Sequence, residues 1–304
     1  MANNYNYKTK DSMKASNITT TPSFTYDTSF VNVPITIASL FDSNTTALPT
    51  LINDNIVSTC IYGQSDISFS STTYYKNSDA GMTNGGLLNY GTVNYFSVDN
   101  LAFQQYKYQG SSVMQAGTFT ISANTGTSTV SFPNSFLNIP IVVVCPTGNL
   151  SSPQIISCSI VSTTTTQFNT LSYYKDGRSN QDGGGVYYSN VGGSTYPGTF
   201  NYIAIDSAAI FLAYKFGGGP IIKCGTFTTV SGTATVTGLG FNNGTVKVFC
   251  SPIGNTSYFM ITCTITAVST TQFSVCAFFK DGRGGQRGGD VYDGPFNYIA
   301  VTTV

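Results

Sequence analysis

The chain contains no histidine and no tryptophan, and only 9% of its 304 residues are charged. Histidine is the commonest general base near neutral pH and the commonest zinc ligand, so catalysis would have to depend on carboxylates, tyrosines or cysteines. The 13 basic and 13 acidic residues cancel, which removes the electrostatic reason to expect a nucleic-acid partner. These absences argue against an enzyme, and we expect no cofactor.

Long hydrophobic runs are also absent. The longest, Ile139–Cys145 and Ala208–Tyr214, reach about a third of the ~20 residues that a membrane-spanning helix requires. The N-terminal segment MANNYNYKTKDSMK is polar and contains no apolar core of a secretory signal. We therefore expect a soluble protein with no export signal and no membrane insertion.

Residues that favour strands and turns are abundant instead. Thr, Ser, Asn, Tyr and Gly dominate, together with Val and Ile, and these residues are depleted in soluble helices. Hydrophobic residues make up 41% of the chain, with 20 tyrosines and 21 phenylalanines, which is enough to build a core. No stretch has sustained helical periodicity. The composition predicts an all-β protein whose surface is rich in hydroxyls and amides.

The strongest pattern is internal repetition. The segment Gln167–Arg178 recurs as Gln272–Arg283, and each copy is followed by a glycine-rich loop and then by FNYIAI or FNYIAV. A fainter copy lies upstream, where Phe69 precedes Lys76 by the same spacing as in the other two copies. The front half repeats as SFVNVPI and SFLNIPI. The repetition predicts three copies of one structural unit.

Each copy is long enough to bury a core of its own, so we expect tandem domains. The expected division is an N-terminal arm 1–16, a divergent first domain 17–99, a linker 100–116, a second domain 117–206, a linker 207–224 and a third domain 225–304. The polar tail Met1–Asn17 is either an anchoring arm that orders on assembly or a frayed terminus.

Short alternating segments and one uninterrupted apolar run, Ile141–Cys145, within the second copy predict an antiparallel β-sandwich of six strands. The expected strands are Phe119–Ser122, Thr127–Phe132, Ile141–Cys145, Ile155–Val161, Gln167–Tyr174 and Asn201–Ile205. The first two flank a turn signal, Ala123–Gly126, which predicts a hairpin between them. Adjacent aromatic residues recur as Tyr74–Tyr75, Tyr173–Tyr174 and Phe278–Phe279, and strand alternation predicts that one of each pair faces the core and the other faces outward.

At these positions the chain resembles the H-type lectin domain. The resemblance rests on FLNIPIVVV (136–144), TTTQF (164–168) and FNYIAI (200–205), with weaker matches in the other copies. It implies a six-stranded sandwich that commonly forms trimers and binds N-acetylgalactosamine-type sugars between subunits; related domains occur in phage tail and other virion proteins. Three copies in one chain are compatible with an internal mimic of that trimer or with tandem beads. Because tryptophan is absent and no family sugar ligand maps onto this chain, the fold carries over and the lectin activity does not.

Two polar glycine-rich loops contain much of the scarce charge. The candidate carbohydrate- or partner-binding residues are Lys175, Asp176, Arg178, Asp182 and Tyr187 in one loop and Lys280, Asp281, Arg283, Asp290 and Tyr292 in the other. Aspartate accepts hydrogen bonds from vicinal hydroxyls, arginine offers a planar fork of donors, and tyrosine offers a stacking face. The alternative is a solvated turn with a local ion pair. The acidic spacing does not match a calcium loop, so no metal site is expected.

Seven cysteines cannot all pair within one chain. Cys145 and Cys158 are 13 residues apart, as are Cys250 and Cys263, but the corresponding early pair has Ser39 in place of its first cysteine. A required disulfide would not be lost from one copy. Buried free thiols are therefore favoured over disulfides.

These features favour a non-enzymatic structural protein of a virus or phage particle, either a fibre or a capsid surface component, assembled in the host cytoplasm. Low charge suits a protein that buries its surface against copies of itself, because charge is depleted in interface cores. The expected partners are further copies in a homo-oligomer, other virion proteins, and a cell-surface glycan. The alternatives are a soluble lectin and a glycan-cleaving enzyme, although the latter needs facing carboxylates that do not recur between the copies.

Overall fold

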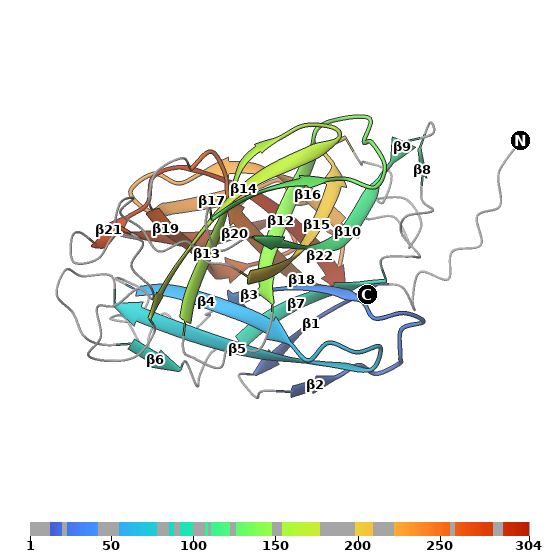
Figure 1. The fold of residues 1–304 in the computed structure, drawn as a ribbon, viewed down its shortest axis with the longest axis horizontal. Coiled ribbons are helices and arrows are strands. Elements are labelled where there is room, and N and C mark those ends of the chain that lie inside the picture. Colours follow the sequence, from blue (N-terminus) through green and yellow to red (C-terminus); the bar gives the residue numbers. More distant parts are fainter. Residues whose placement is uncertain are drawn as a thin grey trace, which may run out of the picture.

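The structure, a computed structural model, describes residues 13–19, 23–41, 55–77, 85–87, 92–99, 107–108, 111–121, 126–147, 154–176, 198–208, 222–255, 259–281 and 288–303. Every regular element within these ranges is a β-strand, so the all-β prediction is confirmed (Figure 1). None of the described residues forms a helix that could cross a membrane.

The strands fall into three successive repeats, which we name by their place in the chain. The first repeat (13–98) contains β1 (Met13–Thr19), β2 (Ser23–Thr25), β3 (Ile35–Phe41), β4 (Asn55–Tyr62), β5 (Ser68–Asn77), β6 (Gly85–Leu87) and β7 (Thr92–Val98). A small ladder follows, of β8 (Lys107–Tyr108) and β9 (Ser111–Ser112). The second repeat (114–206) contains β10 (Met114–Ile121), β11 (Thr127–Ser131), β12 (Pro140–Thr147), β13 (Gln154–Thr163), β14 (Gln167–Asp176) and β15 (Gly198–Asp206). The third repeat (222–303) contains β16 (Ile222–Thr228), β17 (Thr233–Thr237), β18 (Thr245–Pro252), β19 (Phe259–Val268), β20 (Gln272–Asp281), β21 (Gly288–Val291) and β22 (Pro295–Thr303).

The same strand pairing occurs in each repeat. The last strand (β7, β15 or β22) lies between the first strand (β1, β10 or β16) and a further strand (β3, β12 or β18), in a three-stranded antiparallel ladder. A second antiparallel ladder has β5, β14 or β20 at its centre. In the second repeat the two ladders pack face to face, with the Phe119 ring of one ladder 5.6 Å from the Phe168 ring of the other. The arrangement is therefore sandwich-like.

The expected hairpin between the first two strands of the second repeat is wrong. β10 pairs with β15 and β11 pairs with β14, so the two strands belong to different ladders. Ile121 of β10 and Val130 of β11 belong to one core cluster, so the chain crosses from one ladder to the other and both strands bury side chains in the core between them. The hairpin between β13 and β14 is present, and its turn is closed by the Thr164 hydroxyl, which accepts the N–H of Gln167 at 3.1 Å.

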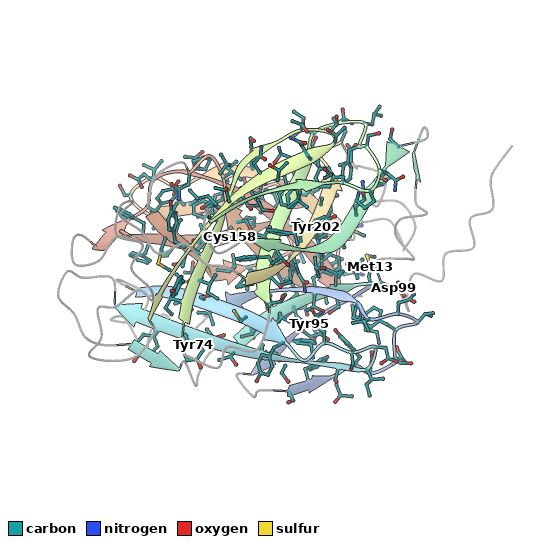
Figure 2. All side chains as sticks on the ribbon, viewed as in Figure 1. Met13, Tyr74, Tyr95, Asp99, Cys158 and Tyr202 are labelled. Carbon is teal, nitrogen blue, oxygen red and sulfur yellow. The ribbon has the colours of Figure 1, made fainter. Side chains whose placement is uncertain are left out.

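Three strands begin before the expected boundaries. β1 starts at Met13 (labelled in Figure 2), within the segment expected to be an arm, and pairs along its whole length with β7. β10 starts at Met114 and β16 at Ile222, both inside the expected linkers. Each of these strands completes the ladder of its own repeat, because it supplies the outer partner of the last strand.

The three repeats close into a ring. β12 of the second repeat pairs in parallel with β4 of the first through Thr147 and Ile61, and β3 of the first pairs with β19 of the third through Phe41 and Ile265. A parallel bridge between Ile253 and Ile160 joins the third repeat to the second. These three junctions use corresponding positions, so each repeat contacts the next in the same manner. Two seven-stranded sheets result, each built from two repeats, with the blue and cyan strands of the first repeat beneath the other two in Figure 1.

The largest core cluster lies between the repeats. It combines residues of all three, among them Phe96, Ile203 and Phe249, and the Phe96 and Phe249 rings are 6.2 Å apart. Buried apolar area is the main favourable term in folding, so this shared core stabilises the ring. A second inter-repeat cluster contains Tyr173 and Phe278, which are 5% and 6% exposed. The expectation that one aromatic of each pair faces outward is therefore wrong for Tyr173–Tyr174, where both side chains are buried, because the face opposite the repeat's own core packs against its neighbour.

Candidate functional site

The buried asparagine of the repeated closing motif joins one repeat to the next. Asn201 donates from Nδ2 to the Thr36 carbonyl at 2.7 Å and to Gln64 Oε1 at 2.8 Å, both in the first repeat. Asn297, at the corresponding position, donates to the Val142 carbonyl of the second repeat at 2.9 Å. Both side chains are almost completely buried, and a buried amide needs such partners. The repeated asparagine is therefore a contact between repeats.

Small polar side chains opposite these asparagines make further contacts around the centre. The Ser251 hydroxyl accepts the N–H of Val144 at 3.0 Å, and the Ser39 hydroxyl donates to the Val248 carbonyl at 2.7 Å. Cys145 occupies the corresponding position in the second repeat and its thiol lies 3.7 Å from the Thr59 carbonyl. Each contact joins a different pair of repeats, so a layer of hydroxyls and one thiol surrounds the centre of the ring.

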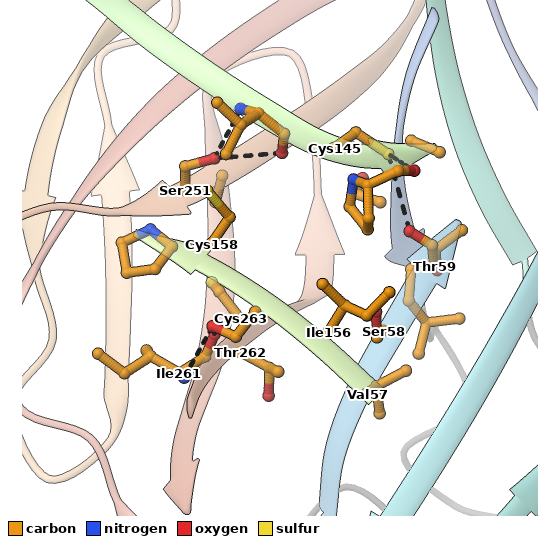
Figure 3. A pocket seen from close by; sticks show the side chains of 18 of the residues that line it. Val57, Ser58, Thr59, Cys145, Ile156, Cys158, Ser251, Ile261, Thr262 and Cys263 are labelled. Carbon is orange, nitrogen blue, oxygen red and sulfur yellow. Dashed lines mark hydrogen bonds between the residues drawn. The ribbon is translucent and has the colours of Figure 1, made fainter. Parts of the chain in front are cut away.

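A pocket of about 90 Å³ lies where the three repeats meet (Figure 3). Six strands line it, β3, β4, β12, β13, β18 and β19, two from each repeat. Its wall contains hydroxyls, thiols and apolar groups, for example Ser58, Cys145 and Ile156, and no charged side chain. We call it the axial pocket. An uncharged wall of this kind favours a neutral ligand, because a buried ion without a partner is costly.

Four of the seven cysteines line the axial pocket, and all seven are free thiols. Burial raises the pKa of Cys145 to about 12 and also raises that of two other lining cysteines, Cys158 and Cys250, as well as that of Cys60, which does not line the pocket. A thiol with a raised pKa stays protonated at neutral pH and is neither a nucleophile nor a metal ligand. No group of three potential metal-ligating residues occurs among the described residues.

The alignment of Cys145 with Cys250 in the sequence is wrong by one residue. Cys145 lies opposite Asn201, whereas Ser251 lies opposite Asn297 and Cys250 is paired with Tyr298. Cys145 therefore faces the centre of the ring, and Cys250 faces the core of its own repeat. Both cysteine pairs are 13 residues apart, so their spacing gives no sign of this shift. A shift of one residue moves a side chain to the opposite face of its strand.

Most of the predicted loop residues lie outside the described part of the chain. This holds for Arg178, Asp182, Tyr187 and Arg283, and for the side chains of Lys175, Asp176, Lys280, Asp281 and Asp290. Their backbones place Asp176 and Asp281 at the ends of β14 and β20, in the same register against the preceding strand. Asp290 lies in β21 and pairs with Phe279. The two loops thus leave equivalent strand ends.

Tyr292 is the one predicted site residue whose side chain is described. Its ring makes edge-to-face contacts with Phe296, at 5.6 Å between centroids, and with Phe279, at 6.4 Å. The ring also lies over Gly294, where a Cβ atom would come within 2.4 Å of it. Burial raises the pKa of its hydroxyl. Tyr292 therefore packs within the third repeat.

Sequence reasoning missed the contacts between the repeats, although it found the motif that makes them. The signal was the asparagine of FNYIAI and FNYIAV, a polar residue repeated inside an otherwise apolar strand. A buried polar residue needs a partner, and its own ladder does not supply one for the side chain. Comparison of the chain with models of known families, with curated proteins and with solved structures finds no match.

Proposed function

We propose that the chain is a non-enzymatic structural protein of a virus or phage particle, a fibre or capsid surface component that acts by assembly. The observation that carries the proposal is the closed ring of three repeats, held by Asn201, Asn297 and a core shared by all three. A closed ring of this kind can serve as a scaffold, because its repeated sequence motifs supply packing contacts within and between the repeats. The virion would be its location.

We further propose that each repeat is a sandwich of the H-type lectin kind, built on the six strands that all three repeats share. The motif residues of the resemblance support this, because they occupy core positions. Phe136 and Phe168 belong to the core cluster of the second repeat, and Phe200 and Tyr202 join them from the closing strand. The ring would then be an internal counterpart of the trimer that such domains commonly form.

The state of the nucleophiles supports a role without catalysis. Buried thiols with raised pKa values are protonated at neutral pH, so they are not poised to attack a substrate. Two carboxylates, Asp99 and Asp206, accept hydrogen bonds from Asn32 and Asn138 and hold the proline-containing segments in place. Both groups act in structure.

Exposed apolar side chains on two of these segments offer a surface for a second copy of the chain. Val31 and Val33 are 85% and 55% exposed, and Leu137 and Ile139 are 49% and 56% exposed. The corresponding residues of the third repeat are polar or lack a side chain, so the surface is confined to two repeats. Val31 and Val33 are two residues apart, as are Leu137 and Ile139, and clusters of exposed apolar groups are typical of interaction sites.

The test is the mass of the full chain in solution, measured by light scattering over a range of concentrations. Wild-type protein should form an oligomer of the 32.3 kDa chain, and the double variant Val31→Asn, Leu137→Asn should dissociate at higher concentrations than the wild type does. Val230→Asn is the matched control, because Val230 is 70% exposed but lies in a different segment. A wild-type protein that is monomeric at every concentration would contradict the assembly proposal.

The second candidate is a soluble carbohydrate-binding lectin. It is favoured by the equivalent positions of Asp176 and Asp281, from which two polar loops begin. A glycan array with the full chain tests it. Saturable binding that is lost in Asp176→Ala or Asp281→Ala, and kept in the exposed control Asp66→Ala, would support the lectin. Absence of binding to any glycan leaves assembly as the function.

A further inference from the structure

Strands β4, β13 and β19, one from each repeat, lie around the axial pocket and correspond to one another. At one of three corresponding positions, a side chain of one strand forms hydrogen bonds with the backbone of the next. There the Ser157 hydroxyl of the second repeat donates to the Ile261 carbonyl at 2.8 Å and accepts the Ile261 N–H at 3.0 Å. A hydroxyl thus satisfies both polar groups of a peptide on the neighbouring strand. The same contact would be possible twice more in a perfectly symmetric ring.

The strand register identifies the residues at the other two places. Ser58 and Thr262 correspond to Ser157, because all three lie opposite the first aromatic of the repeated pair. By the same register Ile156 and Val57 correspond to Ile261. Within the described part of the chain, no hydrogen bond links Ser58 to Ile156 or Thr262 to Val57. This hydrogen-bonded contact is therefore missing at two of the three junctions between repeats. We call these two junctions the open seams and the third, at Ser157, the closed seam.

The missing contact affects the side chain of Ser58. Its side chain is 6% exposed and its hydroxyl has no hydrogen-bond partner among the described residues. Ser58, Ile156, Val57 and Thr262 all line the axial pocket (Figure 3). A buried hydroxyl without a partner is destabilising, and such groups in proteins usually bind an ordered water molecule.

We propose that the axial pocket binds ordered water, which joins Ser58 to the Ile156 peptide and Thr262 to the Val57 peptide. A water molecule needs about 10–15 Å³ and two to four polar partners, and the pocket offers about 90 Å³ with hydroxyl and peptide groups on several sides. The wall has no charge, so the ligand is neutral. Water would take the part that Ser157 plays at the closed seam, since it can donate and accept at once. A small polyol has the same chemistry.

The sign of one stability change tests the proposal. If water binds the Ser58 hydroxyl, Ser58→Ala removes a hydrogen bond and lowers the Tm of the full chain, by about 2–4 °C. If the pocket is dry, the same substitution removes an unpaired polar group, and the Tm stays the same or rises. Ser157→Ala is the control, because it leaves the Ile261 peptide without its partner and lowers the Tm in either case.

A crystal structure of the full chain, from crystals grown without polyols, gives an independent readout. Water within hydrogen-bond distance of both Ser58 and Ile156 is the expected result. An axial pocket without water, or an organic molecule in its place, would overturn the assignment. An unchanged or higher Tm of Ser58→Ala would overturn it as well.

Discussion

Asn297 provides the sharpest test of how the repeats are held together. Alanine at this position removes the amide whose Nδ2 donates to the Val142 carbonyl at 2.9 Å, across the junction between the third and second repeats. Asn297 is 4% exposed, so solvent cannot replace the lost donor without entering the core. The carbonyl of Val142 is then left without that partner on its inter-repeat side.

An acceptor left unpaired in a protein interior costs about 1–3 kcal/mol. For domains of 150–250 residues each kcal/mol lowers the Tm by about 2–4 °C, which gives a decrease of about 2–12 °C for Asn297→Ala. Asn201→Ala should also lower the Tm, because Asn201 donates both to the Thr36 carbonyl and to Gln64, although removal of its buried, unpartnered Oδ1 offsets part of that loss. Thr235→Ala is the control, since the Thr235–Ser274 hydrogen bond lies on the exposed face of a ladder.

The measurement is thermal unfolding of the three full-length variants followed by circular dichroism. Exposed substitutions of this kind change stability by about 0.5 kcal/mol or less, so Thr235→Ala should unfold close to the wild type. If Asn297→Ala and Asn201→Ala also unfold within that margin, the asparagines do not hold the repeats together and the reasoning fails.

Three further predictions follow from packing and titration. Gly117→Ala and Gly225→Ala should each lower the free energy of unfolding by about 1–3 kcal/mol in a denaturant titration, because the new Cβ would lie 2.9 Å from the ring of Tyr202 or Tyr298. If both variants unfold at the wild-type denaturant midpoint, the rings move aside without cost and the prediction is wrong. Stability should fall as the pH rises above 9, because burial raises the pKa of Cys145 from 9.0 to about 12, so the thiol ionises in the unfolded chain before it ionises in the folded one. The free energy of unfolding should decrease by about 1.4 kcal/mol per such buried thiol at pH 10. Equal denaturation midpoints at pH 8 and pH 10 would count against this prediction. The three buried cysteines should react with a thiol reagent at pH 7.5 only as fast as the chain unfolds, whereas all seven should react at once in denaturant; immediate reaction of all seven in the native protein would disprove their burial.

The strands could be predicted from the sequence because each carries its own signal. The alternation of apolar and polar residues, together with the uninterrupted apolar run Ile141–Cys145, placed all six strands of the second repeat. The turn signal at Ala123–Gly126 failed because a turn sequence does not say which partner a strand takes. Pairing depends on which faces the two strands must bury, and both β10 and β11 bury theirs from opposite sides of one core.

The ring could not be predicted from local pattern, because its contacts join residues more than eighty positions apart. Asn201 and Thr36 illustrate the difficulty, because nothing in the sequence around either residue indicates that the two form a hydrogen bond. Tyr173 shows the same limit, since strand alternation assigns it to the outer face and only the neighbouring repeat buries it. Of the predicted site, the sequence identified loops that begin at equivalent strand ends, while the axial pocket depends on three repeats meeting and has no sequence motif of its own.

The radius of gyration of the 32.3 kDa species, measured by small-angle X-ray scattering coupled to size exclusion, tests the closed ring most directly. A compact chain of 304 residues should have a radius of gyration of about 19 Å. Three independent units of about 90 residues strung along flexible linkers would give a value well above ~25 Å, from individual radii of ~12 Å. A value near the first figure is the result that the ring predicts, and a value near the second would contradict it.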